Sequence, residues 1–327
     1  MEIISSEEFK IPDRTAVAIG KFDGIHLGHM ALLKKVIEAG NEKNLKTCVF
    51  TFYPSAASYF SNGEIKEITT YTEKRVIFEK MGIDILVEFP LNQNTAAISP
   101  EDFIENIVCK GLNAAYIAAG YDLSFGYKGL GNAELLKSMA VKENQDENRE
   151  AYRDSNQETN TTQRYEVEII DKLQYGGREI SSTYVREEIA AGHMETVAEL
   201  LGHPYSFVGA VMHGAKLGRK LGFPTMNLYP DAEKELPPIG VYYSMLHFEG
   251  ASYPGITNIG MRPTVTDEKE ISVETYLYDF DQDMYGKNIQ IELLKYKRGE
   301  VKFDSLLELK EQLRRDIFDG RRFQKIL

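Results

Sequence analysis

The stretch that decides the fold is "TAVAIGKFDGIHLGH", residues 15–29, in which an apolar run precedes a glycine-containing turn and two histidines. The apolar run is typical of a buried strand. A helix that begins near His26 would direct its unpaired amides and the positive end of its dipole toward a ligand at the end of that strand. Gly28 would let a phosphate approach the backbone closely, and His26 and His29 lie on one side of the first helical turn. The stretch therefore predicts a phosphate site between a strand and a helix.

Two other interpretations of the histidines remain open at this point. A zinc site needs a third Cys, His or carboxylate ligand, and none lies nearby at a recognisable ligand spacing. Two histidines in an arbitrary chain are most often surface loop residues. The flanking strand, glycines and helix favour the phosphate site over both.

Strand and helix patterns alternate through the first half of the chain. Such alternation predicts right-handed crossovers and a doubly wound α/β fold with a parallel sheet, whose ligands bind beyond the carboxyl ends of the strands. The clearest helix is "SPEDFIENIVCKGL", where Ser99 can cap, Pro100 fits the first turn and Gly111 ends the helix. The strand-like runs are Ala16–Ile19, Thr47–Phe52, Ile83–Phe89, Ala114–Ala119 and Tyr165–Ile170.

The pattern changes in the second half of the chain. After a helical linker, "STYVREEIAAGHMETVAELLGHPY", short alternating segments separated by Gly, Pro and Asp predict a small antiparallel β-barrel. A closing helix is expected in "FDSLLELKEQLRRDIFDG", where an apolar residue recurs at helical spacing from Phe303 to Ile317. We place the two domains at residues 1–186 and 187–327. Residues 142–164 are so polar that we expect a mobile surface insertion there.

Composition excludes several function classes. No apolar run approaches the roughly 20 residues that a membrane span requires, and the N-terminus lacks a signal-peptide pattern, so we expect a cytoplasmic protein. A net charge of −12 argues against nucleic-acid and membrane partners. Cys48 and Cys109 lie in apolar segments, which predicts small core residues and no disulfide.

Several motifs together give a family resemblance. "FDGIHLGH" resembles the HxGH signature of adenylyl- and cytidylyltransferases, and its FDG prefix resembles that of the bifunctional bacterial riboflavin kinase/FMN adenylyltransferases, or FAD synthetases. The resemblance continues through "TFYP", "YTEK", "GYDLSFG" and "ISSTYVR" and covers nearly the whole chain.

The resemblance implies that the first domain transfers AMP from ATP to the phosphate of FMN and releases pyrophosphate. His26 and His29 would stabilise negative charge on the α-phosphate, and Asp122 would line the flavin side of the site. The residues that it places around ATP and the outgoing pyrophosphate are Phe22, Asp23, Gly24, Gly28, Ser182, Thr183 and Arg186.

The segment "GAVMHGAKLGRKLGFPTMN", residues 209–227, predicts a second phosphate site. Glycines allow backbone amides to wrap a phosphate chain, basic side chains supply positive charge, and Thr225 and Asn227 offer oxygen ligands to Mg²⁺. The loop residues concerned are Gly214, Lys216, Gly218, Arg219 and Lys220. A tight basic hairpin turn explains the spacing equally well, but "GFPTMN" resembles the riboflavin kinase fingerprint and favours the functional interpretation.

Glu274, in the strand "ISVETYLYDF", matches the catalytic glutamate of that family. The resemblance implies that it accepts the proton of the riboflavin 5′-hydroxyl, which attacks the γ-phosphate of ATP. "NIGMRPTV" and "RGEVKF" also match, and we expect them in loops where Arg262 and Phe303 contact the flavin. The implied partners are riboflavin, FMN, FAD, ATP, ADP and pyrophosphate, with Mg²⁺ as cofactor; a homo-oligomer is left open.

The chain departs from the family pattern at three positions. Ser55 replaces a usual histidine, Glu179 stands where a basic residue is frequent, and Asn132 stands where an aspartate is usual. These departures keep two alternatives open: a riboflavin kinase with impaired adenylyltransferase activity, and a flavin- or nucleotide-binding regulator. The joint retention of the two histidines, Thr225, Asn227 and Glu274 argues against the regulator.

Overall fold

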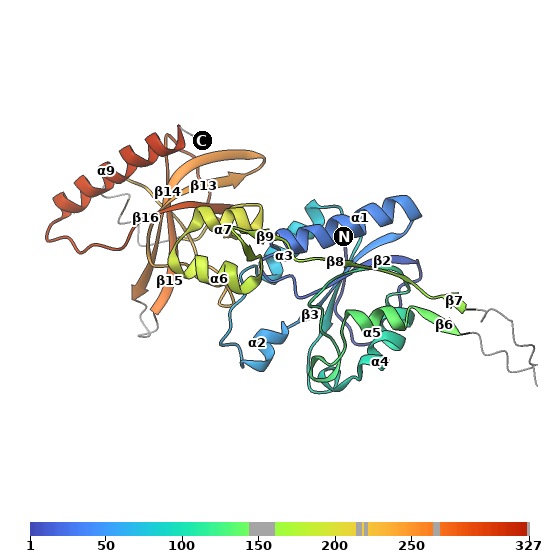
Figure 1. The fold of residues 1–327 in the computed structure, drawn as a ribbon. Helices are drawn as coiled ribbons and strands as arrows, with labels where there is room; N and C mark the ends of the chain where they lie inside the picture. Colours follow the sequence, from blue (N-terminus) through green and yellow to red (C-terminus); the bar gives the residue numbers. More distant parts are fainter. Residues whose placement is uncertain (144–160, 214–217, 219–221, 264–268, 326–327) are drawn as a thin grey trace, which may run out of the picture. The chain divides into compact units, whose positions relative to one another are not determined.

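The computed structural model describes residues 1–143, 161–213, 218, 222–263 and 269–325, and these form two compact units (Figure 1). We call Met1–Ile65 with Lys74–Glu179 the N-terminal unit, and Lys66–Glu73 with Ile180–Leu327 the C-terminal unit. The units divide the chain between Glu179 and Ile180, and a short stretch of the first half belongs to the second unit. Most of the predicted mobile insertion, residues 144–160, lies outside the described residues.

A six-stranded parallel sheet forms the centre of the N-terminal unit, in the order β1-β4-β3-β2-β5-β8. Its strands are β1 (Glu2–Ile4), β2 (Thr15–Ile19), β3 (Lys46–Tyr53), β4 (Ile85–Pro90), β5 (Ala114–Gly120) and β8 (Glu166–Ile170). The sequence order reverses between β2 and β5, and ligands of open α/β sheets bind at such a point. These bounds confirm the five predicted strands to within a few residues at each end.

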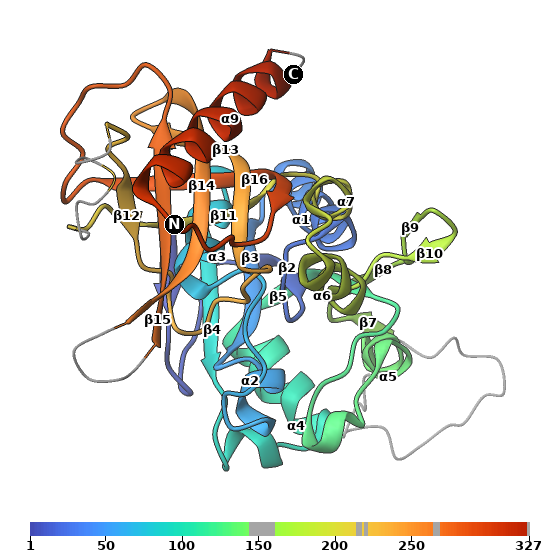
Figure 2. The same cartoon turned by 90° about the vertical axis from the view of Figure 1, so that its left-hand side faces the viewer.

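Helices cover both faces of this sheet, as the doubly wound prediction requires (Figure 2). The helices are α1 (Leu27–Lys43), α2 (Ala56–Phe60), α3 (Tyr71–Lys80), η1 (Thr95–Ala97), α4 (Pro100–Asp102), η2 (Phe103–Gly111), η3 (Tyr127–Gly129) and α5 (Ala133–Ser138). Two short ribbons complete the unit: β6 (Val141–Glu143) with β7 (Thr161–Gln163), and β9 (Gln174–Tyr175) with β10 (Arg178–Glu179).

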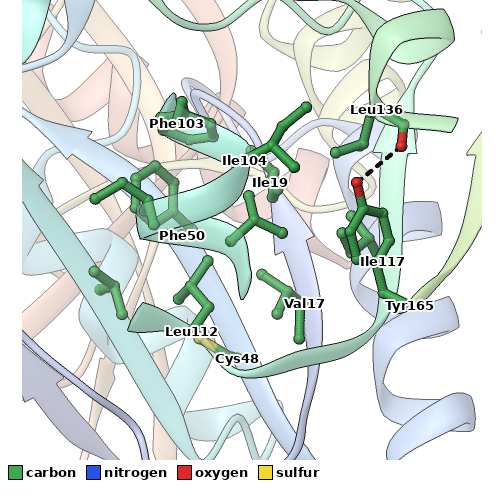
Figure 3. Packing of buried hydrophobic residues seen from close by; sticks show 14 of the residues in the cluster. Val17, Ile19, Cys48, Phe50, Phe103, Ile104, Leu112, Ile117, Leu136 and Tyr165 are labelled. Carbon is green, nitrogen blue, oxygen red and sulfur yellow. Dashed lines mark hydrogen bonds between the residues drawn. The ribbon is translucent and has the colours of Figure 1, made fainter. Parts of the chain in front are cut away.

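The two faces of the sheet have separate cores. On one face, Val17, Ile19 and Phe50 pack against η2 and α5, and the Tyr165 hydroxyl donates a hydrogen bond of 2.9 Å to the carbonyl of Leu136 (Figure 3). The opposite face packs against α1 and α3. Because burying apolar side chains on both faces removes the largest apolar area from water, this sheet is a rigid support for the loops at its edge.

The helix predicted from "SPEDFIENIVCKGL" is confirmed, with one difference. The Ser99 hydroxyl accepts a hydrogen bond of 3.0 Å from the Asp102 amide and caps α4, and Pro100 is the first helical residue. From Phe103 onward the helix takes the wider π form, which ends at Gly111.

Of the cysteines, Cys48 is fully buried and Cys109 half-buried, and both are free thiols.

A six-stranded antiparallel sheet forms the C-terminal unit, in the order β11-β16-β13-β14-β15-β12. The strands are β11 (Tyr205–Ala210), β12 (Met226–Leu228), β13 (Gly240–Phe248), β14 (Ala251–Pro263), β15 (Lys269–Leu277) and β16 (Asn288–Arg298). Beyond β11, the Met212 amide donates to the Asn227 carbonyl (2.8 Å), which links the two edges of the sheet. This link closes the sheet into the expected barrel.

The linker predicted as one helix is two, α6 (Ser182–Ala191) and α7 (Met194–Leu201), because Gly192 ends the first with φ of 76°. The closing helix is α9 (Leu306–Gln324), so Phe303 precedes it. Its buried residues are Asp316 and Gly320, whereas Leu306 is exposed. Gly320 is required because a Cβ there would lie 2.1 Å from the Tyr278 hydroxyl.

Among the described residues we find no helix with the length and apolar character that crossing a membrane would require.

Candidate active sites

The loop after β2 reaches the start of α1 through a strained backbone. Phe22 and Ile25 have positive φ values of 49° and 43°, and Gly24 has 86°. Positive φ is uncommon for residues other than glycine, and here the side chains of Phe22 and Ile25 are fully buried. Their burial holds Asp23 and Gly24 between two anchors at the carboxyl end of β2. The Phe22 side chain therefore belongs to the core, and only its backbone lines the loop.

The structure brings the two predicted histidines together. His26 caps α1, because its Nδ1 accepts a hydrogen bond of 3.4 Å from the His29 amide. The two imidazole rings stack with centroids 3.8 Å apart and planes 16° apart. A Cβ at Gly28 would lie 3.2 Å from two atoms of the His26 ring, so the absence of a side chain keeps room for that ring.

Both imidazoles are uncharged at neutral pH. Burial lowers the pKa of His26 to about 4, although the Asp122 carboxylate opposes this shift. Burial also lowers the pKa of His29 well below its ordinary value, and the nearby His26 and Lys74 lower it further. Nδ1 of His29 is buried and has no hydrogen-bond partner among the described residues. An unpartnered buried nitrogen is costly in free energy, which favours a polar ligand beside it.

Asp122 lies at the same edge of the sheet as the histidines. Ile19 of β2 pairs with Ala119 of β5, and Asp122 follows three residues later. Its carboxylate lies 3.6 Å from Nζ of Lys172, which also binds Glu179 at 2.9 Å. One lysine thus joins the predicted flavin-side residue Asp122 to Glu179.

The residues expected at the pyrophosphate belong to the C-terminal unit. The Ser181 hydroxyl caps α6 by accepting from the Tyr184 amide at 3.2 Å, so Ser182 and Thr183 occupy its first turn. Arg186, one turn later, binds the Glu235 carboxylate at 2.6 Å. Hydroxyls and a guanidinium at a helix N-terminus are suited to bind phosphate oxygens.

The C-terminal unit places three polar residues in one row across neighbouring strands. Asn227 of β12 is directly opposite Glu274 of β15, and Glu274 is directly opposite Asn258 of β14. Directly opposed residues of antiparallel strands share a face, so the three side chains lie on one side of the sheet. Oδ1 of Asn227 is buried and lacks a partner within the described part of the chain.

Gly218 lies close to Phe223 and Thr225. The Phe223 amide donates to the Gly218 carbonyl at 2.8 Å. A Cβ at Gly218 would lie 2.3 Å from the Phe223 carbonyl oxygen and 3.4 Å from the Thr225 hydroxyl. Any side chain at this position would therefore force the backbone at Gly218 or Phe223 to shift. The other loop residues predicted around the ATP phosphates lie outside the described residues: Gly214, Lys216, Arg219 and Lys220.

The flavin-side predictions have mixed outcomes. "NIGMRPTV" is not a loop as expected, because residues 258–263 form the end of β14, where Arg262 pairs with Glu270. Residues 264–268 lie outside the described residues. Phe303 does lie in a loop, between β16 and α9, and is half-buried. On the same sheet face as Glu274, Tyr276 contacts Phe223 ring to ring at 5.8 Å.

Comparisons with known proteins match the two halves of the chain to two different family models. The riboflavin kinase family model matches residues 201–324, and the FAD synthetase family model matches residues 8–151. The bifunctional riboflavin kinase/FMN adenylyltransferase of Listeria monocytogenes is 33% identical over 94% of this chain and 91% of its own length. The protein of that name from Escherichia coli K12 is 34% identical over 94% of this chain and 92% of its own.

The chain belongs to the bifunctional riboflavin kinase/FMN adenylyltransferase family. A solved structure named macrolide-efflux protein, from Streptococcus pneumoniae, superposes with a TM-score of 0.81 at 27% identity, and covers 98% of this chain and 99% of that one. Its fold is that of the present chain. We take the family from the two family models and the curated relatives, which agree with each other.

The three departures from the family pattern have structural roles of their own. Asn132 caps α5, with Oδ1 accepting from the Leu135 amide at 2.8 Å, as an aspartate would. Ser55 caps α2 by accepting from the Ser58 amide at 3.2 Å. Glu179 binds Lys172, which also faces Asp122. Each of the three side chains therefore makes a local contact: two cap helices and one forms an ion pair.

Asn258 and Lys74 were not singled out from the sequence. The asparagine begins the conspicuous motif "NIGMRPTV", yet its position opposite Glu274 depends on the register of a long hairpin. Lys74, in "YTEK", is 1% exposed. A buried lysine is unusual and would point to a special role, but its burial cannot be read from the sequence.

Proposed function

We propose that this protein phosphorylates riboflavin to FMN in its C-terminal unit and adenylylates FMN to FAD in its N-terminal unit, with ATP as co-substrate in both reactions. One observation carries the proposal: a single chain holds the neutral, stacked pair of His26 and His29 and, in its other unit, Asn227 and Glu274 in direct register. The two constellations match the two halves of the family.

For riboflavin phosphorylation, Glu274 is the base. Its carboxylate accepts the proton of the riboflavin 5′-hydroxyl while that oxygen attacks the γ-phosphorus of ATP, and ADP leaves. Thr225 lies close to Gly218, the described residue of the glycine-rich segment. Gly214, Lys216, Gly218 and Arg219 surround the ATP phosphates, and Arg262 and Phe303 contribute charge and stacking toward the flavin.

Mg²⁺ fits the donors of the C-terminal site. It prefers oxygen ligands, and the buried Oδ1 of Asn227 is an oxygen that lacks a partner among the described residues. Thr225 and Asn227 would hold the ion, which neutralises phosphate charge when bound. The same residues keep the ATP phosphates close to Glu274, since Asn227 and Glu274 lie on one face.

For adenylyl transfer, a phosphate oxygen of FMN attacks the α-phosphorus of ATP and pyrophosphate leaves. His26 and His29 are uncharged, and their ring nitrogens act as hydrogen-bonding groups toward the α-phosphate as negative charge builds up. The first amides of α1, together with Asp23, Gly24 and Gly28, line the phosphates. The family resemblance assigns Ser182, Thr183 and Arg186, which belong to the C-terminal unit, to the leaving pyrophosphate, and it assigns Asp122 to the flavin side.

The experiment incubates the purified protein with Mg-ATP and either riboflavin or FMN, and resolves riboflavin, FMN and FAD chromatographically. We expect FMN and FAD from riboflavin, and FAD from FMN. FMN without FAD would identify a kinase that has lost adenylyl transfer. Binding of flavin without either product would identify a regulator.

A further inference from the structure

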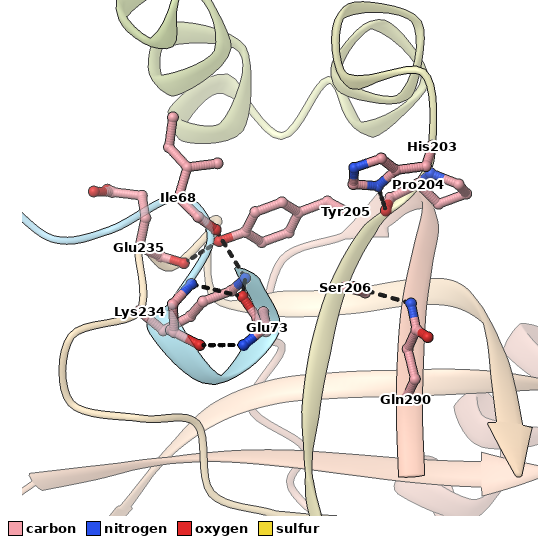
Figure 4. A network of polar contacts seen from close by, with 10 residues as sticks. Ile68, Glu73, His203, Pro204, Tyr205, Ser206, Lys234, Glu235 and Gln290 are labelled. Carbon is pink, nitrogen blue, oxygen red and sulfur yellow. Dashed lines mark hydrogen bonds and ion pairs between the residues drawn. The ribbon is translucent and has the colours of Figure 1, made fainter. Parts of the chain in front are cut away.

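The C-terminal unit contains a buried lysine whose partners come from the first half of the sequence (Figure 4). Nζ of Lys234 lies 2.6 Å from Oε2 of Glu73 and donates to the Ile68 carbonyl at 2.8 Å. The two charged side chains are only 3% and 7% exposed. The ammonium also lies over the rings of Tyr205 and Phe207, 4.3 and 5.6 Å from their centroids.

Backbone hydrogen bonds on both sides of this pair hold the same segment. The Glu67 amide donates to the Glu233 carbonyl at 2.6 Å, and the Glu235 amide donates to the Glu67 carbonyl at 2.8 Å. Glu67 therefore forms an isolated parallel bridge with Lys234, outside the strands of the sheet. This explains why a piece of the first half of the chain belongs to the C-terminal unit.

Glu73 also helps to cap the N-terminus of helix α3, which begins at Tyr71. Its Oε2 accepts the Thr70 amide at 2.9 Å, and its own amide donates to the Thr70 hydroxyl at 3.4 Å. These reciprocal bonds form a capping box. A single carboxylate oxygen thus receives both the Lys234 ammonium and the helix-starting amide, so Lys234 fixes the position of the first turn.

Helix α3 continues from this anchor to the histidine pair. The next residue, Lys74, is 1% exposed, and its charge lowers the pKa of His29. Phe78, one turn later on the same helix face, contacts Phe22 with ring centroids 5.7 Å apart. Phe22 in turn contacts His29 at 5.1 Å. A shift of α3 along its axis would therefore displace the packing behind His29.

The neighbouring Glu235 holds a second group of the predicted adenylyl-transfer site. Its carboxylate binds Nη1 of Arg186 at 2.6 Å, and Nη2 of Arg186 donates to the Lys66 carbonyl. Lys66 directly precedes Glu67, which forms the bridge with Lys234. Residues 233–235 thus contact both the start of α3 and the arginine expected at the pyrophosphate.

We propose that Lys234, a residue of the riboflavin kinase part of the sequence, is a positioning residue for adenylyl transfer: through Glu73 it fixes the helix that packs behind His29. The proposal rests on the proposed function of the histidine pair. It assigns to the buried pair of Lys234 and Glu73 a role in FAD formation rather than in riboflavin phosphorylation, although the lysine lies outside the FAD synthetase match.

The first test compares Lys234→Met, Lys234→Arg and the double variant Lys234→Met/Glu73→Gln with wild type. Removal of Lys234 alone leaves a buried, unpaired carboxylate, whereas the double variant removes both charges, which folded proteins often tolerate. The amide oxygen that the Glu73→Gln change introduces can still accept the Thr70 amide. The matched control is Lys295→Met, which breaks an exposed Lys–Glu pair with Glu195 in the same unit.

Both reactions are measured on each preparation. For the double variant we expect kcat of FAD formation from FMN to fall at least about tenfold, because small misplacements near the reacting groups are costly. KM for FMN should stay near the wild-type value, and riboflavin phosphorylation should be retained. Lys234→Arg, which keeps the charge, should recover part of the lost kcat, and Lys295→Met should leave both reactions unchanged.

Unchanged FAD formation in the double variant would overturn the proposal. So would an equal loss of both reactions, which a purely structural pair would produce. If the double variant does not fold, Thr70→Ala supplies the test, because it removes the hydroxyl that accepts the Glu73 amide and so loosens the same first turn of α3. It should lower FAD formation and spare riboflavin phosphorylation, and unchanged FAD formation would contradict the proposal. A wild-type protein that makes no FAD would instead refute the proposed function.

Discussion

Asn227 and Glu274 are directly opposite each other in the antiparallel pair of β12 and β15. Asn227 is 4% exposed, and its Oδ1 has no partner in the described part of the chain. A buried amide oxygen without a partner destabilises the fold, and a cation that binds it offsets that cost. The pairing thus places an amide oxygen without a described partner and a carboxylate on the same face, in agreement with the roles we propose for them in riboflavin phosphorylation.

Asn227→Ala should weaken the proposed metal site without unfolding the barrel. We expect the Mg²⁺ concentration for half-maximal FMN formation to rise at least about tenfold, as loss of a metal-site group typically does. A Mg²⁺ titration of riboflavin phosphorylation measures it. Asn288→Ala, at the exposed start of β16, is the control. An unchanged Mg²⁺ dependence would remove Asn227 from the ligand set.

Gly218→Ala should selectively impair the kinase. The added Cβ would overlap the Phe223 carbonyl oxygen, so the backbone at Gly218 or Phe223 must shift. We expect riboflavin phosphorylation to fall at least about tenfold, while FAD formation from supplied FMN stays constant. Wild-type rates of riboflavin phosphorylation in this variant would show that the close approach of Gly218 to Phe223 is dispensable.

Local patterns in the sequence predicted β2, β3, β4, β5 and β8 of the parallel sheet, the alternating strands of the second half and the histidine pair, because each depends on neighbours within a few residues. The short edge strand β1 (Glu2–Ile4) was missed. The capping of α4 by Ser99 is such a case. The register that brings Asn258 opposite Glu274 could not be predicted, since it depends on how β14 and β15 pair along their whole length.

Long-range pairing was equally inaccessible. Nothing near Lys66–Glu73 indicates that this segment pairs with residues 233–235, because the two are separated by about half of the chain. The buried pair of Glu73 and Lys234 follows from that pairing. In "FDSLLELKEQLRRDIFDG" the period predicted a helix, but tight packing of Gly320 on Tyr278 decides which side faces the barrel.

Asn132 should replace the usual aspartate without loss. Asn and Asp cap helices about equally well, so Asn132→Asp should retain FAD formation. Asn132→Ala removes the bond to the Leu135 amide and should lower the free energy of unfolding by about 1 kcal/mol. Urea unfolding and FAD formation measure the two effects. A large gain of activity in Asn132→Asp would show that the asparagine impairs adenylyl transfer.

The lowered pKa of His26 predicts a pH dependence of stability. Because its pKa falls from 6.5 to about 4 on folding, the unfolded chain takes up the proton first. The shift corresponds to about 3 kcal/mol in the free energy of unfolding. This stability is fully present above pH 6.5 and is lost as the pH falls toward 4. The free energy of unfolding measured in urea should therefore fall more steeply with decreasing pH for wild type than for His26→Gln. Parallel curves for the two proteins would contradict a buried neutral His26.

The central claim is that two separate sites in one chain carry the two reactions, and the most direct test is one pair of variants assayed for both. Glu274→Gln should abolish FMN formation from riboflavin and spare FAD formation from supplied FMN, whereas His29→Ala should do the reverse. Loss of both reactions from either variant, in protein that circular dichroism shows to be folded, would contradict the assignment of separate sites.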